Sequence, residues 1–149
     1  MFYLCAMESP YNTKFSDAIL TSVFAGIVTT LLSFAYYVGY KEVTGFPLSG
    51  LINVSSLIFV TNTFFLAVGY IYYVFIKNFR KGDLLYIVIF VLLTGLSIFE
   101  AYHIHRSENE LVNLQFHELL GGLFLINGVV AFVGIPVMFH SKKFKDAVI

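Results

Sequence analysis

Four long stretches of the 149-residue chain carry almost no charge, and this pattern restricts the possible folds more than any other feature. A helix needs about 20 apolar residues to cross the roughly 30 Å hydrocarbon core of a bilayer. A helix of a soluble protein, by contrast, pairs an apolar face with a charged one. The uncharged runs therefore predict four membrane-spanning helices, at about residues 18–40, 54–76, 84–104 and 119–139.

The composition agrees with a membrane protein. The chain is 58% hydrophobic and 12% charged, whereas a soluble domain carries about 25% charged residues. The formal net charge of +0 provides no overall field that would attract nucleic acid, so we expect no nucleic-acid partner. With a single cysteine, Cys5, the chain cannot form an internal disulfide or a paired-thiol redox site.

Short connections between the predicted helices favour an all-α, antiparallel four-helix transmembrane bundle in a single domain, residues 1–149. An even number of spans puts both termini and the loop after the second span on one side of the membrane. That side carries seven lysines and arginines and the opposite side carries two, Lys41 and Arg106. Because cytoplasmic loops are enriched in these residues, we expect cytoplasmic termini and location in a bacterial inner membrane.

Small residues recur at helical intervals in three of the spans. Lipid gives helices no hydrophobic reason to associate, so small side chains that allow close backbone approach mark the packing faces. The spacing is four residues in the first span and seven in the fourth, and in the second span Ser55, Asn62 and Gly69 follow one another at seven-residue intervals. It predicts close contacts, within the bundle or between protomers, at Ser22, Gly26, Ser55, Gly69, Gly121 and Gly128.

Each predicted span also has an uncharged polar residue near its middle. One interpretation is hydrogen bonding between helices, for which Asn and Thr are common. The other is a hydrated path or a substrate site at the bilayer centre. The residues of this polar midplane are Thr29, Thr30, Asn62, Thr63, Thr94 and Asn127.

Ionisable residues gather where the third span ends and the fourth begins. The group consists of Glu100, His103, His117 and Glu118, and imidazole with carboxylate is a suitable ligand set for zinc, iron or copper. Haem held by the two histidines is a further alternative. A di-iron bundle would need two Glu-x-x-His motifs, however, and this chain has one. The simpler interpretation is a partly hydrated cluster at the membrane surface, so we expect no cofactor and keep metal or haem as the alternative.

Several short motifs support a resemblance to known sequences: Ala25-Gly26-Ile27-Val28-Thr29-Thr30, Gly45-Phe46-Pro47, Asn53-Val54-Ser55-Ser56, and His117 near the start of the last span. In these the chain resembles uncharacterised families of small bacterial membrane proteins with four helices. The resemblance covers most of the chain and implies a four-helix topology. Those families have no assigned activity, so it implies no mechanism.

Three functions are consistent with the sequence. The first is a non-enzymatic membrane protein that acts as a homo-oligomer or as an accessory subunit of a membrane complex, with the bilayer and itself or another membrane protein as partners. The second is a channel or small transporter that uses the polar midplane. The third is a metal- or haem-binding redox protein that uses the Glu and His group. The chain contains no nucleotide-binding loop or nucleophile elbow.

Overall fold

The computed structural model describes residues 10–45, 53–104 and 110–148, and this part of the chain forms helices and no strands. Phe46, Pro47 and Arg106, which entered the sequence analysis, lie outside the described residues. The helices are α1 (Pro10–Thr44), α2 (Val54–Asn78), α3 (Gly82–His103), α4 (Glu110–Val129), the π-helical turn η1 (Val130–Gly134), α5 (Ile135–His140) and α6 (Lys142–Val148). Together α4, η1 and α5 make one rod of 31 residues.

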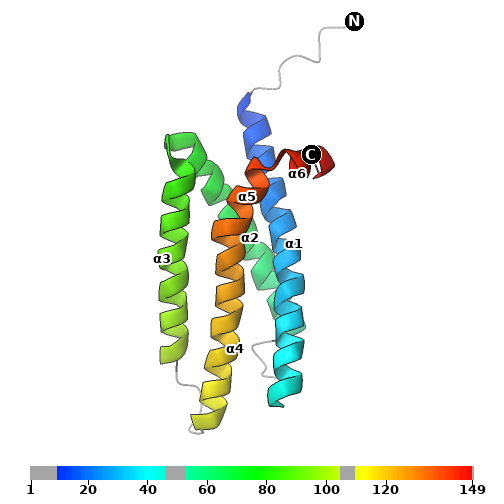
Figure 1. Ribbon diagram of the computed structural model, residues 1–149, viewed down its shortest axis with the longest axis vertical. Coiled ribbons are helices and arrows are strands. Elements are labelled where there is room, and N and C mark those ends of the chain that lie inside the picture. Colours follow the sequence, from blue (N-terminus) through cyan, green and yellow to red (C-terminus); the bar gives the residue numbers. More distant parts are fainter. Residues whose placement is uncertain (1–9, 46–52, 105–109, 149) are drawn as a thin grey trace, which may run out of the picture.

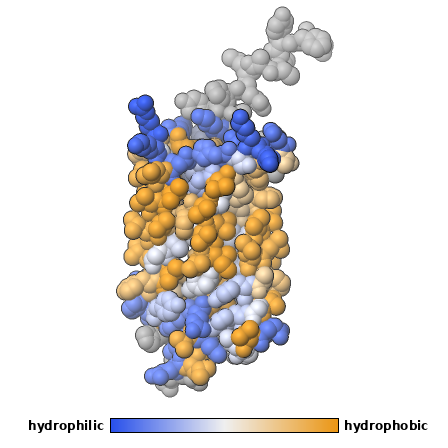
Figure 2. Space-filling model, in the orientation of Figure 1, coloured by the Kyte–Doolittle hydropathy of each residue, from blue (hydrophilic) through white to orange (hydrophobic). Residues whose placement is uncertain are grey.

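The prediction of an all-α arrangement with four long antiparallel helices is confirmed (Figure 1). All four rods are long and apolar enough to cross a membrane, and each extends a few residues beyond at least one predicted boundary. The start of α1, the α2–α3 turn and α6 lie together at what we call the terminal end. The opposite end, where α1 and α3 finish, is the loop end. Figure 2 shows the consequence, a hydrophobic belt between two hydrophilic caps.

Local chemistry sets the helix ends. α2 begins with a capping box, in which the Ser56 backbone N–H donates to Asn53 Oδ1 (2.8 Å) and the Asn53 N–H donates to Ser56 Oγ (3.2 Å). α1 ends at Gly45, whose φ of 65° is the left-handed conformation that favours glycine. The three-residue turn between α2 and α3 depends on Gly82, because a Cβ there would collide with the Phe75 carbonyl.

The closest helix pair is α1 with α2, and small side chains make the approach possible. Gly69 lies directly against Ser22, and a Cβ at Gly26 would lie 3.2 Å from both Asn62 Oδ1 and Phe65 Cβ. One turn further along, Asn62 Nδ2 donates to Thr30 Oγ1 (3.1 Å). The small-residue stripe of the first span therefore faces α2 and lies inside the bundle.

The small residues of α4 face α3 instead. A Cβ at Gly128 would collide with the Thr94 side chain, and one at Gly121 would lie 3.6 Å from the Tyr102 ring. Ser55, which the seven-residue spacing grouped with Gly69, is exposed. The other five predicted packing residues each contact a neighbouring helix of the same chain.

Pro136 disturbs the last rod, and the disturbance has a specific form. The Ile135 N–H donates to the Val130 carbonyl, five residues back, so the chain makes one π-helical turn. Pro136 has no N–H to donate to the next carbonyl, that of Ala131. The buried Tyr86 hydroxyl of α3 donates to this oxygen instead (2.7 Å). A side chain from another helix thus completes the backbone hydrogen bonding of this rod.

The same tyrosine belongs to an aromatic cluster that joins the helices near the terminal end. The Tyr72 ring packs edge-on against Tyr86 (4.9 Å between centroids) and Phe139 (5.2 Å). The Tyr72 hydroxyl donates to Asp83 Oδ1 (2.5 Å), and His140 Nε2 lies 2.9 Å from Asp83 Oδ2. Edge-to-face pairs add stability beyond the area that they bury.

We predict that Tyr86→Phe lowers the free energy of unfolding by about 1–3 kcal/mol, because the buried Ala131 carbonyl is left without a donor. Unfolding in mixed micelles, followed by circular dichroism, measures this change. Tyr70→Phe is the matched control, since Tyr70 lies exposed on α2. Equal stability of the two variants would contradict the role given to the Tyr86 hydroxyl.

We predict that Gly69→Ala destabilises the bundle by about 1–3 kcal/mol, because the added methyl group overpacks the α1–α2 contact at Ser22. The same unfolding assay applies. Gly95→Ala adds a methyl group to a membrane helix where a Cβ meets no other atom within 4 Å, so its effect should be small. A loss of stability in Gly95→Ala as large as that in Gly69→Ala would argue against close packing as the cause.

Candidate functional site

A cavity of about 480 Å³ lies between α2, α3 and α4. α2 packs chiefly on α1 and α3 chiefly on α4, and Figure 1 shows α2 leaning away from α3 as it leaves their shared turn. The cavity lies in the resulting wedge. It is lined by Ser56, Leu57, Val60, Thr61, Phe64, Phe90, Leu93, Thr94, Ser97, Leu120, Leu123, Phe124, Asn127 and Gly128.

The wedge opens at the side of the bundle. Val60, Phe64 and Leu93 line it and are exposed on the outer surface, with 61%, 39% and 50% of their area accessible. These residues belong to the hydrophobic belt, so the surrounding medium at that level is lipid. None of the 14 lining residues is charged. The cavity is thus an apolar space that can be reached from the membrane.

Five of the lining residues are polar, and the hydroxyl groups of three of them, Thr94, Ser97 and Ser56, are satisfied within their own helix or its cap. Thr94 Oγ1 donates to the Phe90 carbonyl (2.7 Å), and Ser97 Oγ donates to the Leu93 carbonyl (2.9 Å). Ser56 belongs to the capping box of α2. Such bonds to the preceding turn satisfy hydroxyl groups in a helix without any ligand.

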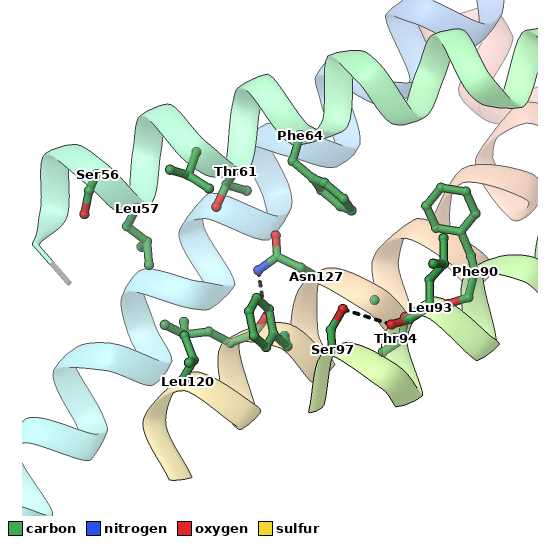
Figure 3. Close-up of a pocket in the computed structure, with 14 residues that line it drawn as sticks. Ser56, Leu57, Thr61, Phe64, Phe90, Leu93, Thr94, Ser97, Leu120 and Asn127 are labelled. Carbon is green, nitrogen blue, oxygen red and sulfur yellow. Dashed lines mark hydrogen bonds between the residues drawn. The ribbon is translucent and has the colours of Figure 1, made fainter. Parts of the chain in front are cut away.

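The other two polar residues retain unused hydrogen-bonding capacity. Asn127 Nδ2 donates to the Leu123 carbonyl (2.8 Å), which leaves its amide oxygen without a donor among the described residues. The Thr61 hydroxyl likewise has no hydrogen-bond partner among the described residues, although Thr61 is only 4% exposed. Figure 3 shows both side chains reaching into the space, from α2 and from α4. An unpaired polar group in an apolar environment is costly, so this pair favours a polar ligand atom between the helices.

Three other hydroxyl groups, those of Thr21, Ser33 and Tyr37 on α1, are buried and have no hydrogen-bond partner in the described structure. They differ from Thr61 in their surroundings, because none of them lines this cavity. Only a group that borders an open space can be satisfied by a molecule that enters it. Of these four hydroxyl groups, Thr61 is therefore the one that a molecule in the cavity could satisfy.

The remaining residues of the polar midplane lie elsewhere. Thr29 donates to the Ala25 carbonyl inside α1, and Thr30 joins Asn62 at the α1–α2 contact. Thr63 is exposed on the surface of α2. The midplane therefore divides into helix-packing residues, the surface residue Thr63 and the cavity residues Thr94 and Asn127. The six positions do not line one common space.

The four predicted metal ligands lie toward the loop end, and three of them have separate hydrogen-bond partners. His117 Nε2 donates to the Ile104 carbonyl, and His103 Nδ1 donates to the Phe99 carbonyl (2.8 Å). Glu118 accepts a hydrogen bond from Tyr40, and Glu100 is exposed. Among the described residues, no three His, Cys, Asp or Glu side chains are grouped closely enough to hold a metal ion.

The sequence analysis did not single out Thr61 or Ser97, although both line the cavity. Ser97 follows Thr94 by three residues, and side chains at that spacing share a helix face. This spacing could have indicated a polar stripe on the third span. Thr61 lies beside Asn62 and Thr63 in the sequence, and only the packing of α2 shows which of the three faces the wedge.

The four membrane-length helices, together with the hydrophobic belt that they form, show an integral membrane protein. Comparisons of the chain with models of protein families, with curated proteins and with solved structures found no match.

Proposed function

We propose that this chain is a small, non-enzymatic integral membrane protein that binds a lipophilic molecule in the cavity between α2, α3 and α4. The observation that carries this proposal is the pair of unused polar groups, the Thr61 hydroxyl and the Asn127 amide oxygen, in an apolar space that opens toward lipid. Ligand pockets are mostly apolar with a few placed polar groups, and the volume of about 480 Å³ is in their usual range.

The depth of the polar groups indicates the class of ligand. Asn127 lies nine residues after Glu118 and thirteen before His140, or about 13 Å and about 20 Å along the helix. These two charged or titratable residues bound the uncharged part of the rod, so Asn127 lies inside the hydrocarbon region. A phospholipid headgroup would remain at the surface. The fitting ligand is a lipophile whose hydroxyl group resides in the hydrocarbon core, such as a long-chain alcohol, because a hydroxyl can accept from Thr61 and donate to the Asn127 amide oxygen.

This function is supported better than the channel. A channel that used the whole midplane would need those residues around one passage, and the structure divides them between a helix contact and the cavity. The packing of the small residues also weakens one argument for an oligomer. The small residues that could have formed a seam between protomers, such as Gly69 and Gly128, have their neighbours within one chain. Association with a second copy or an accessory role in a complex would have to use other faces.

The proposal includes an orientation, with the terminal end in the cytoplasm of a bacterial cell. Seven basic residues support it, because they gather at that end in the structure and basic residues favour the cytoplasmic side. They are Lys14, Lys77, Arg80, Lys81, Lys142, Lys143 and Lys145.

We predict that the detergent-solubilised protein binds the dye 6-propionyl-2-naphthol saturably and that Asn127→Leu or Thr61→Val weakens this binding. The hydroxyl of the dye can accept a hydrogen bond from Thr61 and donate one to the Asn127 amide oxygen, and loss of either bond should raise the Kd by about tenfold. Dye fluorescence, which shifts to shorter wavelength in an apolar site, measures the binding in a titration.

Asn62→Leu is the matched control for this experiment. Asn62 is an amide in the middle of a span like Asn127, but it bonds to Thr30 at the α1–α2 contact and does not line the cavity. The variant should lose stability and retain dye affinity. If wild type, Asn127→Leu and Thr61→Val all bind the dye equally, the proposed site is wrong.

We predict opposite labelling of the two ends of the bundle in intact cells, tested in a chain whose Cys5 is replaced by serine. A membrane-impermeant maleimide should react with Val43→Cys at the loop end, where Val43 is 87% exposed. It should react with Lys143→Cys only after the cells are permeabilised. The reverse pattern would show that the terminal end faces outward.

A further inference from the structure

A second cavity, of about 380 Å³, lies on a different face of α4, where α4 runs between α1 and α3 near the loop end (Figure 1). It shares no lining residue with the first cavity. Its lining differs in character, because three tyrosines and a glutamate border it. The lining residues are Tyr36, Tyr40, Ile98, Tyr102, Glu118, Gly121, Gly122 and Leu125.

Two consecutive glycines of α4 lie beside the aromatic rings, and the close approach of Tyr36 requires the second, Gly122. A Cβ at Gly122 would collide with the ring and hydroxyl of Tyr36, and a Cβ at Gly121 would lie 3.6 Å from the ring of Tyr102. Tyrosines from α1 and α3 can therefore lie against the α4 backbone on either side of it. Tyr40 extends the aromatic wall, with its ring centroid 6.0 Å from that of Tyr36.

Hydrogen bonds fix the carboxylate beside these rings. The Tyr40 hydroxyl donates to Glu118 Oε2 (2.9 Å) and lies 3.0 Å from the Gln115 carbonyl, so one hydrogen is shared between two acceptors. The Tyr36 hydroxyl donates to the Glu118 backbone carbonyl (3.2 Å). No lysine, arginine or histidine among the described residues forms an ion pair with Glu118. Within the described part of the chain, the exposed carboxylate therefore keeps an acceptor oxygen and a charge that no ion pair neutralises.

The cavity lies at the level where the hydrocarbon region meets water. The uncharged part of the last rod begins after Glu118, and that of α1 ends at Tyr40. Among the described residues at the loop end, acidic residues outnumber lysines and arginines. The acidic residues are Glu42, Glu100, Glu110 and Glu118, and the basic one is Lys41.

We propose that this second cavity binds an organic ammonium group, held over the tyrosine rings and against the Glu118 carboxylate. Aromatic faces attract cations, and several rings around one space are the usual means of recognising alkylated ammonium groups. The ammonium group can belong to a zwitterionic lipid headgroup or to a soluble amine. Simple membrane anchoring would place tyrosines around the whole circumference of the bundle. It would not require them to converge on one carboxylate and two glycines.

The inference is independent of the proposed ligand in the first cavity, and its test uses different residues. The protein is reconstituted in nanodiscs with equal parts of phosphatidylethanolamine, phosphatidylcholine and phosphatidylglycerol, and retained lipids are counted by native mass spectrometry. The wild type should retain an ammonium-bearing lipid over phosphatidylglycerol by about fivefold, the selectivity expected from one cation–π contact. Glu118→Gln and Tyr102→Leu should each abolish this preference.

Glu100→Gln is the matched control, because Glu100 is an exposed carboxylate near the end of α3 that does not line the cavity. A second experiment titrates tetramethylammonium and ethylammonium into the detergent-solubilised protein and follows tyrosine fluorescence. Amine binding that depends on Glu118 and Tyr102, without lipid selectivity, would assign the site to soluble amines. Tyr102 is half exposed, so Tyr102→Leu should fold even if Glu118→Gln does not. The absence of both lipid selectivity and amine binding in the wild type would overturn the proposal, as would binding unchanged in both variants.

Discussion

The hydrocarbon core contains no water, so each polar group in a span needs a partner within the protein, and the rest of this structure depends on that constraint. Thr29, Thr94 and Ser97 meet it locally, by donating to carbonyls of their own helices. Ala131 cannot, because a π-helical turn and a proline remove its helical donors, and the Tyr86 hydroxyl of α3 replaces them. The requirement for one hydrogen bond thereby fixes how α3 lies against the last rod.

The same constraint distinguishes packing residues from candidate ligand-binding residues. Asn62 and Asn127 are both amides near the middle of a span, and both donate to the carbonyl four residues back. Asn62 makes a second bond, to Thr30 on α1, whereas the oxygen of Asn127 borders an open space. Position in the bundle, and not residue type, determines which amide is available to a ligand.

The sequence was sufficient to predict the helices and their antiparallel order, because each uncharged run has the length that a bilayer requires. It also identified most of the polar residues that pack the helices or line the cavity. It could not predict which of them face the cavity, another helix or the outer surface. Thr61, Asn62 and Thr63 are consecutive, and in the structure they face the wedge, the α1–α2 contact and the outer surface, respectively. Their directions depend on the rotation of α2 about its axis, which close packing of Ser22 against Gly69 determines. Likewise, Glu118 was predicted beside histidines, and tyrosines of α1 are its nearest partners.

The wedge between α2 and α3 has its apex at the three-residue turn before Gly82, where the backbones are closest. Thr61 lies 17 residues before the end of α2, about 25 Å from that apex. A change of about 10° in the angle between the two helices would therefore alter the width of the cavity by about 4 Å at this level. The turn carries Arg80 and Lys81, both exposed at the terminal end. The geometry gives the α2–α3 pair the form of a lever, so that any contact at the terminal end that changed this angle would change the width of a space deep inside the membrane.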